Sequence, residues 1–259
     1  EKMGLHGCPT CAMRFDEAPG WMVGEPGKGL NAMFLMMNAA RLHVALQGVG
    51  LLDAAWQKAH AYAQDRRQMR APGSAGPAPD VIVAHPAVKR MLDTQRAWVD
   101  GGRVLAYQTA IELDVGKFGA GALQTQAQQW CALVTPIMKS IFSHQAFHGG
   151  SDCLQVFGGH GFVREWGVEQ IVRDARVTMI YEGTNEIQAI DLLVRKVMAD
   201  GGQGMNALLD SLAADLPQDS KASTAAHARI QTLRAVTVQI VGTAAQDAAL
   251  AFRVALARM

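Results

Sequence analysis

The chain has 259 residues, of which 49% are hydrophobic and only 6% aromatic, and its formal net charge is +1. This length can bury a sizeable core, and the abundance of Ala, Leu, Gln and Met relative to Val and Ile favours packed helices over sheet. The near-zero charge argues against nucleic-acid binding driven by bulk charge, and the longest stretch without charged residues, Phe118 to Met138, carries several glutamines and is too polar for a bilayer core.

The first residues, 1–24, are rich in glycine and proline, with a strand-like piece near residues 10–15. Such a piece cannot form a sheet alone, so we interpret it as the end of a β-region. The sequence starts without an initiator methionine and ends inside a helical pattern, so we expect a piece of a longer protein. No signal peptide is expected, because glycine and proline rather than an apolar segment follow Met3.

Cys8 and Cys11 have the CxxC spacing that occurs in zinc and redox sites. A zinc site needs a second pair of ligands, and neither Cys131 nor Cys153 belongs to such a pair. A structural role is therefore favoured over metal or redox chemistry, and free cysteines fit a cytoplasmic location.

Apolar residues recur every three or four positions from residue 29 to about residue 67, which predicts one long helix. Further apolar residues on its other faces, such as Met36 and Leu46, predict burial nearly all round. Arg41 interrupts this apolar surface. Either Arg41 is paired or reaches an edge, which is the favoured reading, or it points into a site.

The glycine- and proline-rich stretch 71–80 breaks this pattern. Helix resumes at Pro86, a good first-turn residue, and a glycine loop at residues 116–121 follows it. A third helix is expected from about residue 124 to residue 155, with a kink at Pro136. Three long helices with short connections predict an antiparallel bundle.

A glycine turn at residues 158–161 is followed by a short helix over residues 165–175. Thr184 is a good N-cap for the next helix. The apolar face of that helix consists of Ile187, Ile190, Leu193, Val194 and Val197. A further short helix, a polar linker and an alanine-rich final helix over residues 224–259 complete the chain.

Two glycine-rich stretches invite comparison with phosphate-binding loops. Gly24 to Gly29 is not a P-loop, because Met22 and Gly29 stand where a glycine and a Ser or Thr are required. The turn at residues 158–161 follows a helix rather than a strand, which excludes a Rossmann site. Alone it would more often be a helix C-cap, although its glycines let backbone N–H groups approach a phosphate.

A lone carboxylate, Glu182, stands between Tyr181 and Gly183 just before a helix start. The helix dipole would stabilise any carboxylate there, so the position alone is unremarkable, but the group could also act as a positioned base. No metal site is expected from the histidines, which lack ligand spacing supported by carboxylates: His144, His148 and His160.

Taken together, these residues resemble the C-terminal half of the acyl-CoA dehydrogenase family. The most specific matches are Gln155 to Phe162, Arg164 to Trp166, Arg173 to Arg176 and Tyr181 to Gln188. The extended loop near residues 71–86 is similar to that of a longer bacterial subgroup that includes 3-methylmercaptopropionyl-CoA dehydrogenases.

The resemblance implies a mainly α fold, an antiparallel helical bundle over residues 25–200. Residues 1–24, with Lys2 to Gly7, would be the end of the family's β-domain, and residues 201–259 the start of an additional helical extension.

The implied activity is FAD-dependent α,β-dehydrogenation of an acyl-CoA thioester, a reaction of fatty acid metabolism. Glu182 matches the catalytic base that removes the α-proton, while a hydride passes from the β-carbon to the flavin N5. The family's alternative base position, on the long helix, is Ala40 here and cannot serve. The matched substrate-binding positions are Arg41, Asn38, which replaces an acidic residue of some relatives, Tyr181 and Gly183.

The resemblance also implies two groups of FAD contacts. Residues matching those that hold the diphosphate and adenosine part from a neighbouring subunit are Arg66, Gln68 (a hydroxyl residue in some relatives), Gln155, Gly158 and Gly159. Thr184 and Glu186 match positions that contact FAD near a helix start. A homodimer or homotetramer is implied, with electron-transfer flavoprotein as acceptor; neither nucleic acid nor membrane is an expected partner.

Two other classes of function stay open: a non-catalytic relative that uses the helical domain for assembly, and an acyl-CoA oxidase that passes electrons to oxygen. The family's N-terminal helical domain and most of its β-domain have no counterpart in these 259 residues. We therefore expect the chain alone to fold and self-associate, to be inactive, and to bind FAD weakly or not at all.

Overall fold

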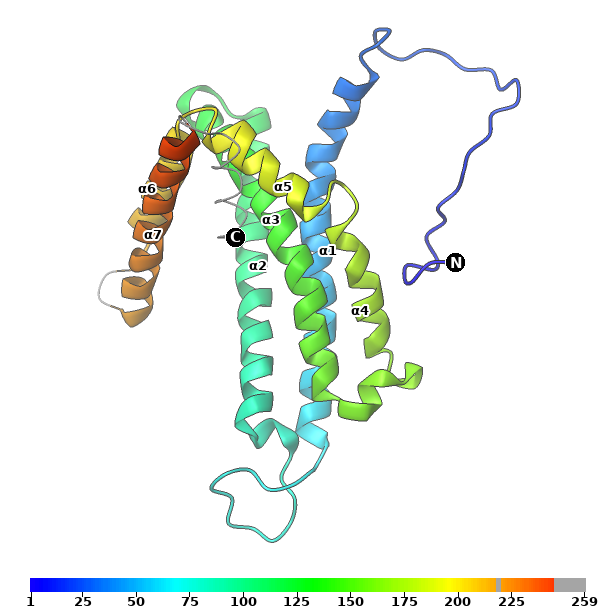
Figure 1. The fold of residues 1–259 in the computed structure, drawn as a ribbon, viewed down its shortest axis with the longest axis vertical. Helices are drawn as coiled ribbons and strands as arrows, with labels where there is room; N and C mark the ends of the chain where they lie inside the picture. Colours follow the sequence, from blue (N-terminus) through cyan, green and yellow to red (C-terminus); the bar gives the residue numbers. More distant parts are fainter. Residues whose placement is uncertain (218–219, 245–259) are drawn as a thin grey trace. The chain divides into compact units, whose positions relative to one another are not determined.

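The computed structural model describes residues 1–217 and 220–244, and the regular structure there is helical apart from one isolated β-bridge (Figure 1). The α-helices are α1 (Gly29–Asp65), α2 (Pro86–Phe118), α3 (Gly121–Val156), α4 (Val168–Arg176), α5 (Asn185–Leu192), α6 (Gln203–Ala214) and α7 (Lys221–Ala244). Short helical turns of other pitch are η1 (Ile82–Ala84), η2 (Gly158–Phe162), η3 (Arg164–Trp166), η4 (Val177–Met179) and η5 (Leu193–Val197). The mainly α fold class is confirmed.

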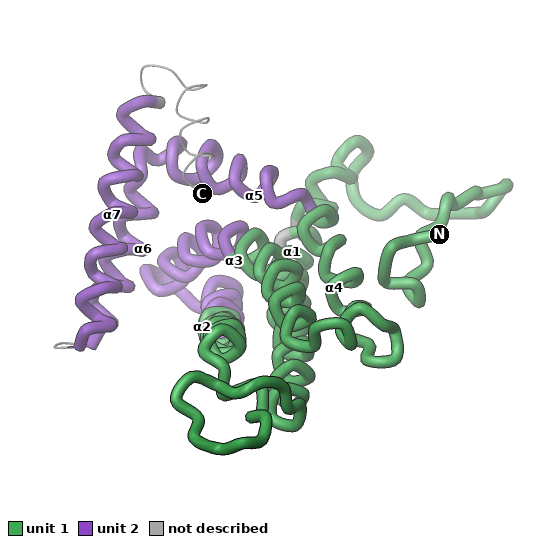
Figure 2. The backbone as a smooth tube through the Cα atoms, turned by 60° about the horizontal axis from the view of Figure 1, so that its bottom comes forward, with its two compact units in different colours: residues 1–106, 138–182 green, residues 107–137, 183–259 purple. Residues whose placement is uncertain are grey.

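The chain divides into two compact units (Figure 2). The first comprises residues 1–106 and 138–182, and the second residues 107–137 and 183–259. Helices α2 and α3 contribute to both. The domain boundaries expected at residues 24 and 200 come from the family resemblance and not from compactness, so they stay a prediction.

In the first unit, α1 and the start of α2 run antiparallel. Trp56 on α1 donates its indole N–H to the Leu92 carbonyl on α2 at 3.0 Å, and Asp53 on α1 pairs with Arg103 on α2 at 2.7 Å. Of these two pairs, the one nearer the start of α1 is farther along α2, so the two helices run in opposite directions.

Helix α3 runs parallel to α1 and touches its backbone. A Cβ at Gly48 would lie 2.6 Å from the Phe142 carbonyl oxygen, and one at Gly149 would lie 2.7 Å from Leu52 Cδ1. The residue numbers of the contacting pairs increase together on the two helices, so α1 and α3 run in the same direction. Helix α2 runs opposite to both. The predicted antiparallel arrangement of consecutive helices therefore holds in this unit.

The core of the first unit lies where the end of α1, the end of α3 and the start of α4 meet. Small side chains on α1 let these helices pack closely, because alanine keeps the backbones near one another. The buried residues of this core are Ala55, Ala59, Ala63, Ile82, Leu92, Cys153, Val156, Phe157, Val168 and Ile171.

Two predictions about helical packing are corrected. Helix α1 is not buried all round, because Met36 is 64% and Leu46 41% exposed. The glycine loop after α2 is shorter than expected: α2 continues through Gly116 and ends at Phe118, since a single glycine lowers helix stability by only about 1 kcal/mol and does not by itself stop a helix.

Residues 1–28 form turns and irregular chain, and the strand expected near residues 10–15 is absent from this described segment. A single strand has no ladder partner here, so its backbone has no reason to become regular. The start of the segment is attached to α4: the Leu5 N–H donates to Asp174 at 2.7 Å, and Arg173 donates to the Met3 carbonyl at 2.8 Å.

In the second unit, Thr184 is the N-cap of α5, as predicted: its side-chain oxygen accepts the Ile187 N–H at 3.4 Å. The helix ends in a wider turn, η5, where the Met198 N–H donates to the Leu193 carbonyl at 2.8 Å. Leu193 packs with Ile240 of α7. Ile187 and Val194 are exposed, so the buried face is Ala189, Leu192, Leu193 and Val197.

The final helix begins at Lys221, earlier than predicted, and the predicted residues 245–259 lie outside the described part of the chain. Near residue 165, Gly167 (φ 65°) separates η3 from α4, so the single helix expected there is two elements. No described helix is both long and apolar enough to cross a membrane.

Candidate functional site

The C-terminal end of α1 turns into a loop that returns to the same place. Arg66 leaves the helix with an extended backbone, and its carbonyl accepts the Ile82 N–H at 2.8 Å. The Gln68 N–H donates to the Asp80 carbonyl at 3.0 Å, and the Asp80 N–H donates to the Met69 carbonyl at 2.8 Å. These bonds close the loop like a hairpin and fix the direction of the chain at residues 66–69.

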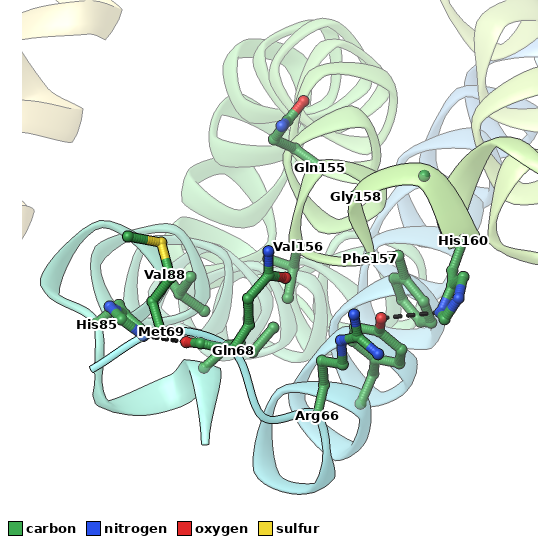
Figure 3. A pocket seen from close by; sticks show the side chains of 13 residues that line it. Arg66, Gln68, Met69, His85, Val88, Gln155, Val156, Phe157, Gly158 and His160 are labelled. Carbon is green, nitrogen blue, oxygen red and sulfur yellow. Dashed lines mark hydrogen bonds between the residues drawn. The ribbon is translucent and has the colours of Figure 1, made fainter. Parts of the chain in front are cut away.

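A cleft of about 480 Å³ lies beside this loop (Figure 3). It is lined by five of the residues predicted to contact FAD: Arg66, Gln68, Gln155, Gly158 and Gly159. The first two come from the loop, and the others from the end of α3 and the start of η2. The fold therefore brings residues 66–68 and 155–159 of one predicted group, far apart in sequence, to one surface.

The three glycines of the turn differ in what a side chain at each position would meet. Gly158 has φ 58°, a conformation that disfavours a side chain, and a Cβ at Gly161 would lie 2.5 Å from the Leu154 carbonyl oxygen. Gly159 has neither constraint, because a Cβ there would meet no atom within 4 Å. Its backbone faces open space beside the cleft, where a ligand could approach closely.

An aromatic cluster supports the turn. The Tyr62 hydroxyl lies 2.9 Å from His160 Nδ1, and the Tyr62 ring stacks on Phe157 with centroids 4.3 Å apart. His160 in turn stacks on Trp166 with centroids 4.8 Å apart. Sequence reasoning missed Tyr62, although it lies one helical turn before Arg66 and therefore on the same face.

The charges around the cleft leave one arginine available. Among the described residues, no hydrogen bond or ion pair involves the Arg66 side chain, which is exposed, whereas Arg67 and Arg70 donate to carbonyls of their own loop. The Ala71 N–H holds the pKa of Asp80 below its ordinary value, so this carboxylate stays ionised to stabilise the loop. Arg66 thus presents a guanidinium to an incoming anion.

Glu182, the predicted base, has a left-handed backbone (φ 54°), which is unusual for a residue with a side chain. It is partly buried, and Gly183 beside it has φ 84°. The preceding Tyr181 donates its hydroxyl to the Gln47 side-chain oxygen on α1. Burial raises the pKa of Tyr181, so the hydroxyl stays protonated as a donor and anchors the turn that carries Glu182.

The remaining predicted residues are not among those that line the cleft. Arg41 is 6% exposed and buried on α1, which excludes a place at an edge. The side chain of Asn38 lies outside the described part of the structure. Thr184 caps α5, and Glu186 is exposed in its first turn; both belong to the second unit.

Glu182 and the cleft both belong to the first unit, and both lie beside α1. The distance between them can therefore be derived from residue positions along this helix. Tyr181, next to Glu182, contacts Gln47, whereas Arg66, the predicted diphosphate contact, lines the cleft at the end of α1. At about 1.5 Å per residue, the two places lie roughly 28 Å apart along the helix. They are two separate places on this chain.

Residues 27–197 match the family model described as the acyl-CoA dehydrogenase, C-terminal domain. The chain is 40% identical over 232 residues to the 3-methylmercaptopropionyl-CoA dehydrogenase of Ruegeria pomeroyi, covering 90% of this chain and 40% of that protein. It is 33% identical over 244 residues to the broad-specificity linear acyl-CoA dehydrogenase FadE5 of Mycobacterium tuberculosis, covering 91% and 39%. The chain thus spans well under half the length of these relatives.

Solved structures show the same fold. The butyryl-CoA dehydrogenase of Megasphaera elsdenii is 27% identical with a TM-score of 0.53, covering 65% of this chain and 39% of that one. ACDH-11 of Caenorhabditis elegans, in complex with C11-CoA, is 21% identical with a TM-score of 0.73, covering 87% and 37%. The second likeness concerns the fold alone. From the family match over most of its length, this chain belongs to the acyl-CoA dehydrogenase family, within its C-terminal domain.

Proposed function

We propose that this chain forms the helical part of an FAD-dependent acyl-CoA dehydrogenase in which Glu182 removes the α-proton of an acyl-CoA thioester. One observation carries the proposal: five residues matched to FAD contacts converge on a single cleft that has open backbone and an available cation. The family membership supports the reaction class.

The residues of the cleft fit the diphosphate and adenosine part of FAD. The Arg66 guanidinium offers planar donors that suit phosphate oxygens, and Gly159 leaves room for backbone N–H groups to approach them. The amides of Gln68 and Gln155 could donate to or accept from ribose hydroxyls. When bound, FAD supplies the flavin ring that accepts the hydride from the substrate's β-carbon.

Glu182 would act on the α-carbon from a fixed turn. The Tyr181 hydroxyl ties the turn to Gln47 on α1, so the carboxylate is held in place rather than left on a mobile loop. In our proposal, the Glu182 carboxylate takes the α-proton and its backbone N–H donates to the thioester carbonyl. That donation stabilises the negative charge that develops on the carbonyl oxygen as the proton leaves.

The separation along α1 determines whether Glu182 and the cleft of one copy could contact the same FAD molecule. A ribityl chain joins the flavin to its diphosphate and is much shorter than the roughly 28 Å between Gln47 and Arg66. Glu182 and the cleft of one copy would therefore serve different FAD molecules. A flavin placed against Glu182 would have its diphosphate in the cleft of a neighbouring copy, in a homodimer or homotetramer.

The substrate and acceptor belong to the same proposal. The relatives are named for 3-methylmercaptopropionyl-CoA, linear acyl-CoA and butyryl-CoA substrates, so an acyl-CoA thioester is the proposed substrate class. Electron-transfer flavoprotein is the proposed acceptor, and the cytoplasm the proposed location.

The test is Glu182→Gln in the flavin-loaded protein, with acyl-CoA-dependent dye reduction as the readout. Glutamine keeps the shape but cannot accept the α-proton, so dye reduction should be lost. Glu112→Gln on α2, where the carboxylate accepts the Gln108 amide N–H, should leave dye reduction unchanged. Dye reduction retained by Glu182→Gln would rule out the mechanism. Peroxide formation, rather than reduction of electron-transfer flavoprotein, would indicate an oxidase instead.

A further inference from the structure

His85 lines the same cleft as Arg66 and Gln155, yet no resemblance assigned it a role. It is the last residue before α2 and follows directly on η1. Its Nε2 lies 2.9 Å from the Gln68 carbonyl oxygen, so this nitrogen carries the proton and donates. Figure 3 shows His85 reaching the cleft beside Gln68.

The other ring nitrogen, Nδ1, has no hydrogen-bond partner among the described residues. Because the bond to Gln68 fixes the ring, Nδ1 is held in place as well, on a residue that lines the cleft. A neutral His85 would present a lone pair there, and a protonated one a cationic N–H. The second form suits phosphate oxygens, which are acceptors.

We propose that His85 binds the diphosphate of FAD through Nδ1, together with Arg66 from the end of α1. The inference rests on the proposed FAD site and adds a ligand to it. Both cationic groups would then come from the two ends of one closed loop, which the Arg66 carbonyl and the Ile82 N–H join at 2.8 Å. Loop closure would thus set the spacing of the two cations.

Asp80 and Lys89 lie near His85, and Arg66 and His160 line the same cleft. Asp80 in the loop is close enough that the charge of His85 helps to lower the pKa of the Asp80 carboxyl. The Arg66 guanidinium opposes a further positive charge in the cleft, and Lys89 lies one turn along α2. A bound diphosphate outweighs that repulsion because it is the largest charge in the cleft.

Two substitutions separate the two ring nitrogens. His85→Gln can still donate to the Gln68 carbonyl from its terminal amide but has no group at the Nδ1 position. His85→Asn has a donor near the Nδ1 position but cannot reach Gln68. If His85 only holds the loop, Gln should substitute for it; if Nδ1 binds the ligand, Asn should substitute better.

The experiment is a titration of the 259-residue chain with ADP, followed by the amide NMR signals of the glycine turn, with His227→Gln on α7 as a control. We expect His85→Gln to weaken ADP binding about tenfold, and His85→Asn to weaken it less.

The outcomes separate this inference from the proposal beneath it. ADP affinity of His85→Gln equal to wild type, while Arg66→Ala weakens binding, would overturn the role of His85 and leave the FAD site intact. Saturable ADP binding that Arg66→Ala leaves unaffected would overturn both.

Discussion

The Tyr62 hydroxyl lies 2.9 Å from His160 Nδ1 and joins the last turn of α1 to the glycine turn η2. The bond connects the two groups of residues that meet at the cleft, since Arg66 follows Tyr62 on one side and Gly159 precedes His160 on the other. The position of the glycine turn relative to Arg66 therefore depends on this contact.

Tyr62→Phe should keep the stack on Phe157 and lose the hydrogen bond to His160. A typical hydrogen bond contributes about 0.5–1.5 kcal/mol, so the free energy of unfolding in urea should fall by that amount. The matched control is Tyr107→Phe on α2, where the ring is exposed. Equal effects of the two substitutions would contradict the role of the Tyr62 bond.

Gly159→Ala should weaken ADP binding with little effect on stability, whereas Gly161→Ala should lower stability. A methyl at Gly159 meets open space, so the free energy of unfolding should change by less than about 0.5 kcal/mol while ADP binding weakens. A methyl at Gly161 meets the Leu154 carbonyl oxygen and should cost about 1–3 kcal/mol. Urea unfolding and an ADP titration measure both quantities; unchanged ADP binding by Gly159→Ala would contradict the open backbone as a ligand surface.

The left-handed backbone of Glu182 should cost stability. Glu182→Ala and Glu182→Gly both remove the side chain's interactions, but only glycine tolerates φ 54° freely, so the glycine variant should be more stable by about 1 kcal/mol. The control is the same pair of substitutions at Gln108 in α2. At this helical position the alanine variant should be more stable than the glycine variant. An alanine variant as stable as the glycine variant at position 182 would mean that the turn relaxes without strain.

Asp80 should make the loop sensitive to acid. The folded-state pKa of Asp80 lies below its ordinary value of 3.8, so its contribution to stability is present above that pH and is lost as pH falls through the lower, folded value. Asp80→Asn cannot titrate. The difference in unfolding free energy between wild type and Asp80→Asn should therefore be constant above about pH 5 and shrink below about pH 4. A difference that does not vary with pH would exclude this carboxylate as the source.

The long elements were predictable because their signals are local. The three- and four-residue spacing of apolar residues located α1, and Pro86 marked the start of α2. What failed depended on neighbours: the expected strand near residues 10–15 has no partner in the described segment, and Met36 is exposed although it continues the apolar pattern of α1. Spacing within one helix contains no information on either.

The candidate site was predictable where its motifs are contiguous. The glycine turn and Glu182 stand in short recognisable stretches, whereas His85 and Tyr62 join the cleft through loop closure and helix packing. His85 reaches Gln68 because backbone bonds fold residues 66–82 back on themselves, and a sequence pattern does not reveal that pairing.

The central claim is that Glu182 and the glycine cleft of one chain serve different FAD molecules. The most direct test mixes two inactive variants of the flavin-loaded protein, Glu182→Gln and Arg66→Glu, and measures acyl-CoA-dependent dye reduction by the mixed oligomers. If sites are shared between copies, one site in each mixed pair combines an intact Glu182 with an intact Arg66, and activity should return toward half of the wild-type value. Mixed oligomers that are formed and remain as inactive as the separate variants would show that each chain builds its site alone and would contradict the account.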